Sequence, residues 1–309
     1  MHPPHTIDCP DPFARAARAP SIGRLADGRL YPAPPALQGA LAAVICRDTR
    51  GVCLDSVQRL SHFPATLLVS LSWYQNLDAG LVQRTAAGPH WQPFGAAVVL
   101  SGSQSNPCVS WAPTTGRGGM LCFTADSARA LFGLDVLAIH DRFMDAHRVL
   151  DASWQPFLAA LLQAQDDAAT LVVLEQHVAP RWQALQGCAS AAPSLRQWGR
   201  HWVAHLALQA QTWRQTHSLR QVERRIKAHS GRSLREWEAL VKTEGVFFAA
   251  RERYEAGLPL GLADLALDEG FADQAHMSRA VKRISGFSPS EFAQRFMADE
   301  SFWMYRLWV

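Results

Sequence analysis

The C-terminal third of the chain repeats one helix pattern, and this repeat constrains the fold more than any other feature. Ser218-Leu-Arg-Gln221 has the form of a capping box, in which the serine hydroxyl accepts from the third helical amide and the glutamine reaches back to the cap. The pattern predicts a helix that begins at Ser218 and ends at Gly231, since glycine takes the conformation that closes helices. Its narrow apolar stripe would consist of Leu219, Val222 and Ile226.

A second pair of helices is predicted over Leu262–Phe292. The first should stop at Gly270, with Phe271 anchoring the turn and Asp273 capping the next helix. That helix should end at Gly286, and Ser288-Pro289 should begin another because proline suits the first helical position. The expected buried side chains are Leu262, Leu265, Ala266, Met277, Ala280, Val281 and Ile284.

Both segments resemble the DNA-binding units of AraC/XylS-family transcription regulators. The likeness covers about residues 200–298, and its Gly-Phe, Asp-Gln, Ser-Arg, Lys-Arg and Gly-x-Ser-Pro elements follow in order in LADLALDEGFADQAHMSRAVKRISGFSPSEF. The resemblance implies two helix-turn-helix units that enter adjacent major grooves of double-stranded DNA. It also implies a cytoplasmic, nucleoid-associated, homodimeric activator that contacts RNA polymerase.

The resemblance assigns contacts to individual side chains. Base contacts read the sequence, as when arginine pairs with guanine or glutamine with adenine. Phosphate contacts position the protein on the DNA without specifying its sequence. For each charged residue the alternative is a solvated helix face, and for His276 it is a capping or surface role. The base set is Arg220, Gln221, Arg224, Gln274, His276 and Arg279, and the phosphate set is Ser218, Arg225, Lys227, Ser278, Lys282 and Arg283.

The chain departs from the family pattern at three positions. Ile226 and Val281 stand where the family usually has phenylalanine, so both helix-turn-helix cores should be slightly smaller. Gly245 lies inside residues 234–254, the expected helix between the two units. Glycine there costs about 1 kcal/mol relative to alanine, so we expect a looser relative orientation of the units.

Short strands are predicted upstream. In Leu67–Trp73, Val69, Leu71 and Trp73 alternate with serines, which is typical of a strand with one buried face. Similar runs at 96–101, 108–111 and 120–124 indicate an antiparallel sheet or barrel. Beyond Asp126, a candidate cap, we expect helices at 127–132, 153–164, 170–185 and 194–216.

These elements predict an α+β fold, with a β-rich, barrel- or cupin-like sensor domain that contains helices, followed by an all-α domain. We divide the chain into a flexible arm (1–36), an effector-sensing and dimerisation domain (37–190), a DNA-binding domain (195–298) and a C-terminal tail (299–309). Residues 187–193 are the predicted linker. The sensing role is implied by the resemblance only.

A small-molecule effector pocket is the hypothesis for the upstream aromatic residues. They gather around the predicted strands and suit an apolar pocket, although aromatic side chains are more often simply core. The pocket set is Trp73, Tyr74, Trp91 and Trp111, with His90 and Phe94 nearby.

Charge and composition limit the function classes. Residues 1–195 hold 13 Arg, no Lys and 14 acids, whereas residues 196–309 hold 17 Arg plus Lys against 13 acids, which places the basic excess in the C-terminal part. A basic end suggests a polyanionic partner or a solvated helix face. Apolar runs are too short for a membrane span, and the six scattered cysteines argue against a metal site. His201 and His205 are expected to be packed or surface histidines rather than metal ligands.

No enzyme or cofactor is predicted, because the common nucleotide-binding, metalloprotease and hydrolase motifs are absent from the sequence. The alternative is an enzyme or cysteine-reactive sensor coupled to the DNA-binding module, for which Pro107-Cys108 is a partial match. A third possibility is a regulator that acts through protein contacts alone, with decayed DNA binding.

Overall fold

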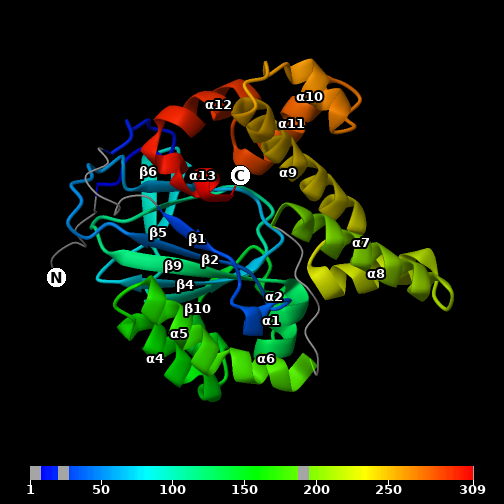
Figure 1. Cartoon of the computed structure of the whole chain (residues 1–309), viewed down its shortest axis with the longest axis horizontal. Helices are drawn as coiled ribbons and strands as arrows, with labels where there is room; N and C mark the ends of the chain where they lie inside the picture. Colours follow the sequence, from blue (N-terminus) through cyan, green and yellow to red (C-terminus); the bar gives the residue numbers. More distant parts are fainter. Residues whose placement is uncertain (1–7, 20–27, 187–194, 309) are drawn as a thin grey trace.

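The chain has an α+β fold, in which a β-rich region with helices precedes an all-helical region (Figure 1). The computed structural model describes residues 8–19, 28–186 and 195–308. The predicted linker at 187–193 lies outside the described residues.

Two antiparallel sheets form the β-rich region. The six-stranded sheet runs in the order β1-β2-β9-β4-β7-β10, and the four-stranded sheet in the order β3-β8-β5-β6. The strands of the larger sheet are β1 (Arg29–Tyr31), β2 (Leu41–Asp48), β9 (Arg117–Phe123), β4 (Val69–Gln75), β7 (Val98–Ser101) and β10 (Phe143–Asp145). Those of the smaller sheet are β3 (Leu60–Phe63), β8 (Cys108–Trp111), β5 (Gly80–Thr85) and β6 (Gly88–Pro93).

Both faces of strand β4 in the larger sheet are covered by other parts of the protein. Its Val69, Leu71 and Trp73 lie in an apolar core with the helices on one side of the sheet, as the alternation predicts. The opposite face of β4 is also covered, since Ser70 is only 5% exposed and Tyr74 is partly buried. The serines therefore face the protein interior and not solvent.

Helices α4, α5 and α6 cover the Trp73 side of the larger sheet (Figure 1). The expected helix over 170–185 is two helices, because Pro180 has no amide hydrogen for a helical bond at that point. The cap before α1 is Thr124 and not Asp126, which lies in the first turn. The helices of this region are α1 (Ala125–Phe132), α2 (Val136–Ile139), α3 (Ala146–Val149), α4 (Gln155–Gln163), α5 (Asp167–His177) and α6 (Ala179–Gln186).

The all-helical region follows the predicted local signals closely. Ser218 and Gln221 form the capping box of α8, Asp273 caps α11, and Ser288 caps α12 with Pro289 at its first position. Gly231 and Gly286 end α8 and α11 with φ of 84° and 86°, in the region that favours glycine. The helices are α7 (Leu195–Arg214), α8 (Leu219–Ser230), α9 (Leu234–Glu255), α10 (Leu262–Asp268), α11 (Gln274–Ser285), α12 (Pro289–Ala298) and α13 (Trp303–Trp308).

The described part of the arm expected to be flexible at 1–36, and of the tail at 299–309, is held by specific contacts. Arg295 of α12 donates to the carbonyl oxygens of Phe13 and Ala14, and the amide of Glu300 donates to Ala16 O at 3.0 Å. Trp303 of α13 donates to Ser61 of β3 at 2.8 Å. The described part of the arm and the tail therefore pack on each other and on the smaller sheet.

Gly245 does not interrupt α9, which is helical throughout Leu234–Glu255. A Cβ atom at this position would lie 2.5 Å from Glu269 Oε2 and 2.9 Å from an Arg200 guanidinium nitrogen. The glycine thus makes room for the ion pair between α7 and the end of α10, and it does not loosen the helix as the sequence suggested.

Two glycine-to-alanine substitutions compare the cost of a methyl group beside a movable ion pair with its cost beside a buried ring. Gly245→Ala should change the free energy of unfolding by less than about 1 kcal/mol, since higher helix propensity offsets displacement of a weak exposed ion pair. Gly119→Ala should destabilise by about 1–3 kcal/mol, because its methyl group would overlap the Trp73 ring. Urea unfolding measures the free energy of unfolding of both variants. A larger loss of stability in Gly245→Ala than in Gly119→Ala would contradict this account of Gly245.

Candidate nucleic-acid interface and effector cavities

Helix α8 presents a polar face to solvent. Val222 and Ile226 are buried at 3% and 4% exposure, whereas the predicted contact residues on this helix are exposed. Leu219, expected in the apolar stripe, is 64% exposed because it opens the first turn, beyond the buried part of the helix. The exposed set is Ser218, Arg220, Gln221, Arg224, Arg225 and Lys227.

Helix α11 has the same division. Met277, Ala280, Val281 and Ile284 are buried, as predicted. Asp273 accepts from the His276 amide at 2.6 Å, and the His276 ring packs against Phe271 at 5.3 Å between centroids. The predicted contact residues Gln274, His276, Arg279, Lys282 and Arg283 are exposed, and Ser278 is half-buried.

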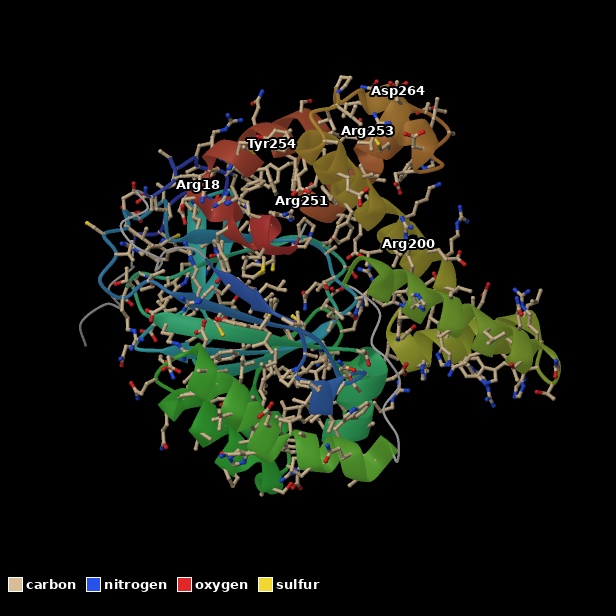
Figure 2. The ribbon with its side chains drawn as sticks, viewed as in Figure 1. Arg18, Arg200, Arg251, Arg253, Tyr254 and Asp264 are labelled. Atoms are coloured by element: carbon tan, nitrogen blue, oxygen red, sulfur yellow. The ribbon has the colours of Figure 1, made fainter. Side chains whose placement is uncertain are left out.

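Several cations on these two helices have no acidic partner among the described residues. Arg220, Arg224 and Arg279 make no hydrogen bond or ion pair within the part of the chain that the structure describes, in contrast to Arg200, Arg251 and Arg253 of the neighbouring helices. Arg251 pairs with Glu255 at 2.6 Å, and Arg253 pairs with Asp268 (Figure 2). The unpaired cations are available to an anionic partner without first breaking an ion pair.

Two predicted contact residues are already engaged within the chain. Gln221 Oε1 accepts from the Ser218 amide at 2.9 Å as part of the capping box. Arg225 lies over the Trp213 ring at 6.0 Å. The base contact expected of Gln221 therefore competes with its role in starting α8.

Helix α9 joins the two exposed helices. It has 22 residues and is about 33 Å long at 1.5 Å per residue. Its first turn follows α8 directly, and α10 and α11 both pack against it (Figure 1). One continuous helix therefore connects the two helix-turn-helix units.

The C-terminal ends of α8 and α11 contact the β-rich region. His229 near the end of α8 lies 2.7 Å from Asp126 of α1, and Arg129 donates to the His229 ring nitrogen at 2.6 Å. At the end of α11, the Ala65 amide donates to Ile284 O at 2.9 Å. The ends that carry Arg220 and Gln274 are left exposed.

Two adjoining cavities lie between the sheets and the helical region. The first, of about 110 Å³, is lined by Arg47, Arg59 and Trp111 among others, and we call it the Arg47 cavity. The second, of about 90 Å³, is lined by Glu244, Phe94 and Cys108 among others, and we call it the Glu244 cavity. Residues common to both are Phe63, Ser72, Tyr74, Ser110, Met120 and Met304.

Only part of the predicted pocket set reaches these cavities. Tyr74 lines both, and Trp111 lines the Arg47 cavity. Trp73 is fully buried in the core on the other side of the sheet, because adjacent strand residues point to opposite faces. Trp91 packs edge-on against Trp111 at 5.7 Å and lines neither cavity.

The sequence analysis missed the small side chains and the carboxylate that line the cavities. Ser70, Ser72, Ser101 and Ser110 leave space where larger side chains would fill the gap between the sheets. The alternation of Ser70 and Ser72 with apolar residues in β4 was the available signal. Glu244 comes from α9, and burial raises the pKa of its carboxyl to about 7.

Comparisons with known proteins do not assign a family. No protein-family model and no curated protein matches the sequence. Among solved structures, an apo variant of ToxT from Vibrio cholerae strain SCE256 is similar, with 11% identity, a TM-score of 0.38, and 87% of this chain and 98% of that chain covered. ToxT with bound unsaturated fatty acid, from the same strain, is similar with 12% identity and a TM-score of 0.36, and the match covers 78% of this chain and 94% of that chain. At such low values, the function has to be argued from the chain's own residues.

No helix among the described residues is long and apolar enough to cross a membrane. No group of three or more His, Cys, Asp or Glu side chains in the same ranges is arranged to hold a metal ion.

The contact between α1 and α8 predicts a pH dependence of stability. Burial acts to raise the pKa of Asp126, but the hydrogen bond and charge of His229 outweigh it, with help from Trp202 and Arg129, and hold the pKa below its usual 3.8. A lowered pKa means that the carboxylate stabilises the fold above about pH 4, and that this stabilisation is lost as pH falls through the folded-state pKa.

Asp126→Asn should therefore lower the Tm by a few degrees at neutral pH, and the difference should shrink below about pH 4. Thermal unfolding monitored by circular dichroism across pH measures this. Asp78→Asn, at an exposed acid with no recorded hydrogen bond, is the control and should show no such trend. A Tm difference that persists at low pH would reject the ion pair as its cause.

Proposed function

We propose that the chain is a sequence-specific DNA-binding transcription regulator of the AraC/XylS type. In this proposal α8 and α11 each enter a major groove, and α9 holds them one turn of DNA apart. The observation that carries it is that α8 and α11 share one form: each begins at a side-chain cap, ends at a glycine, buries an apolar stripe and exposes its polar side chains, and α9 joins them without a break.

The exposed charges support the same proposal. Arg220, Arg224 and Arg279 have no acidic partner among the described residues, and arginine pairs bidentately with guanine. Gln274 and His276 occupy the first turn of α11, the part of a recognition helix that meets base edges. Phosphate contacts are assigned to Ser218, Arg225, Lys227, Ser278, Lys282 and Arg283, and base contacts also to Gln221.

The β-rich region is proposed to sense a small-molecule effector. Its two cavities adjoin the helical region, and the ends of α8 and α11 contact it through Asp126 and Ala65. A ligand that binds one arrangement of these contacts more tightly would shift the orientation of the reading helices. We further propose a cytoplasmic, nucleoid-associated homodimer that activates transcription through RNA polymerase, as the sequence resemblance implies.

Cysteine chemistry at Cys108 or Cys122 is disfavoured as the alternative. Burial raises the pKa of Cys108 and Cys122 to about 12, so almost none of either thiol is ionised at neutral pH. Nucleophilic cysteines need a lowered pKa, since the thiolate is the reacting form.

The first experiment is selection of bound sequences from a random DNA pool with the purified full-length protein. We expect an enriched motif of two blocks one helical turn apart, and its loss in the Arg224→Ala/Arg279→Ala double variant. An Arg251→Ala/Arg253→Ala variant, which removes arginines already paired with acids, is the matched control and should keep the motif. Enrichment of a single block, or of none, would contradict reading by two helices.

Single substitutions test the division between base and phosphate contacts. Arg279→Ala should weaken binding to the selected motif by about 1–3 kcal/mol and relax its sequence preference at one position. Lys282→Ala should weaken binding on all sequences alike and reduce the slope of log K against log salt by about one. Titrations on selected and random DNA at several salt concentrations measure both, and equal behaviour of the two variants would overturn the division.

A further inference from the structure

The Glu244 cavity has an unusual charge balance. Glu244 is the one carboxylate among the described residues that line it, and no lysine, arginine or histidine is among them. The remaining polar lining consists of hydroxyl, thiol and amide groups, such as Ser70, Ser101 and Gln104. An anionic ligand would therefore meet a like charge in this cavity and no cation to offset it.

Glu244 itself has no hydrogen-bond or ion-pair partner among the described residues. Its carboxylate lies against Gly199 of α7, where a Cβ atom would be 3.3 Å from Oε2. Removal of water from the carboxyl raises its pKa to about 7, and no cation among the described residues counteracts this. An unpaired carboxylate in such a place costs stability unless something else pairs with it.

Three aromatic rings line one side of the same cavity. Phe94 stacks between Tyr74 at 5.9 Å and Phe143 at 5.3 Å between ring centroids. Aromatic faces attract cations, and they also pack against apolar ligand bodies. The cavity thus combines apolar surface, cation-attracting faces and one unpaired negative group.

The size of the cavities limits the ligand. The Glu244 cavity has about 90 Å³ and adjoins the Arg47 cavity of about 110 Å³. An apolar cavity of about 150 Å³ is enough to hold benzene. A ligand with one aromatic ring or an aliphatic body of similar size fits the pair.

We propose that the Glu244 cavity binds a small ligand with an apolar, single-ring-sized body and a protonated amine that pairs with the Glu244 carboxylate. The inference rests on the proposed function only where it expects the bound amine to affect DNA binding. The binding site stands on the cavity, its aromatic rings and the unpaired carboxylate.

The position of Glu244 connects such a ligand to both reading helices. Glu244 belongs to α9, on which both helix-turn-helix units are built. Pro64 and Thr66 also line the cavity, and between them the Ala65 amide caps α11 at Ile284 O. An amine seated on Glu244 therefore touches the rod between the units and the segment that holds α11.

The test uses three one-ring probes of similar size on the purified full-length chain at a pH above 7, where Glu244 is ionised. They are phenethylamine (cationic), hydrocinnamate (anionic) and phenethyl alcohol (neutral), each followed by calorimetry and thermal shift without DNA. We expect phenethylamine to bind more than about tenfold more tightly than hydrocinnamate. Binding of hydrocinnamate as tight as that of the amine, or binding of no probe, would overturn the proposal.

Variants then locate the site. Glu244→Gln keeps the shape of the side chain and should weaken phenethylamine more than about tenfold while leaving phenethyl alcohol nearly unchanged. Glu238→Gln, at an exposed acid of the same helix, is the matched control and should bind like the wild-type chain. Ser72→Leu, which fills space shared by both cavities, should weaken all three probes. Unchanged amine binding in Glu244→Gln or Ser72→Leu would place the ligand elsewhere and reject the site.

DNA binding of the same preparations is also measured, without any probe. This measurement tests the proposed regulator independently of the proposed amine site. DNA binding with no preference for the amine would reject the ligand and leave the regulator. Amine binding that depends on Glu244, in a chain that selects no DNA motif, would support the ligand site and reject the regulator.

Discussion

The continuity of α9 is the constraint on which the rest of the structure depends. This one helix joins the two helix-turn-helix units, so their relative placement depends on its unbroken backbone hydrogen bonds. Gly245 is compatible with that rigidity because the space it leaves is filled by Arg200 and Glu269. A kink in α9 would change the distance between α8 and α11 even if both kept their own folds.

The helical region does not pack as an independent body. Its apolar core includes Ile45 and Leu67 of the β-rich region together with Trp237 and Phe292 of the helices. Polar contacts at His229 and Ile284 lie at the margin of this shared core. The lining of the cavities and the buried faces of α8 and α11 therefore meet in one shared core, which is the physical requirement for coupling if both are sites.

Local chemistry was predictable from the sequence, and long-range placement was not. The capping box at Ser218 and the glycine at position 286 act within a few residues, so the ends of α8 and α11 were predicted correctly. Trp73 and Tyr74 are neighbours in sequence but face opposite sides of a sheet, and only the packing of helices on one side decides which faces a cavity. Glu244 looked like any helix-surface acid, because its burial comes from other elements, namely α7 and the strands of the β-rich region.

The segment of residues 299–308 has a consequence for biosynthesis. Trp303 and Phe302 cover β3, and Glu300 pairs with Arg47 of β2, although these strands leave the ribosome long before that segment does. Until then His62 and the apolar residues beside it lack their partners. A nascent chain arrested after the second helix-turn-helix unit would expose this surface, so it would be a natural target for chaperones that hold unfinished sheets.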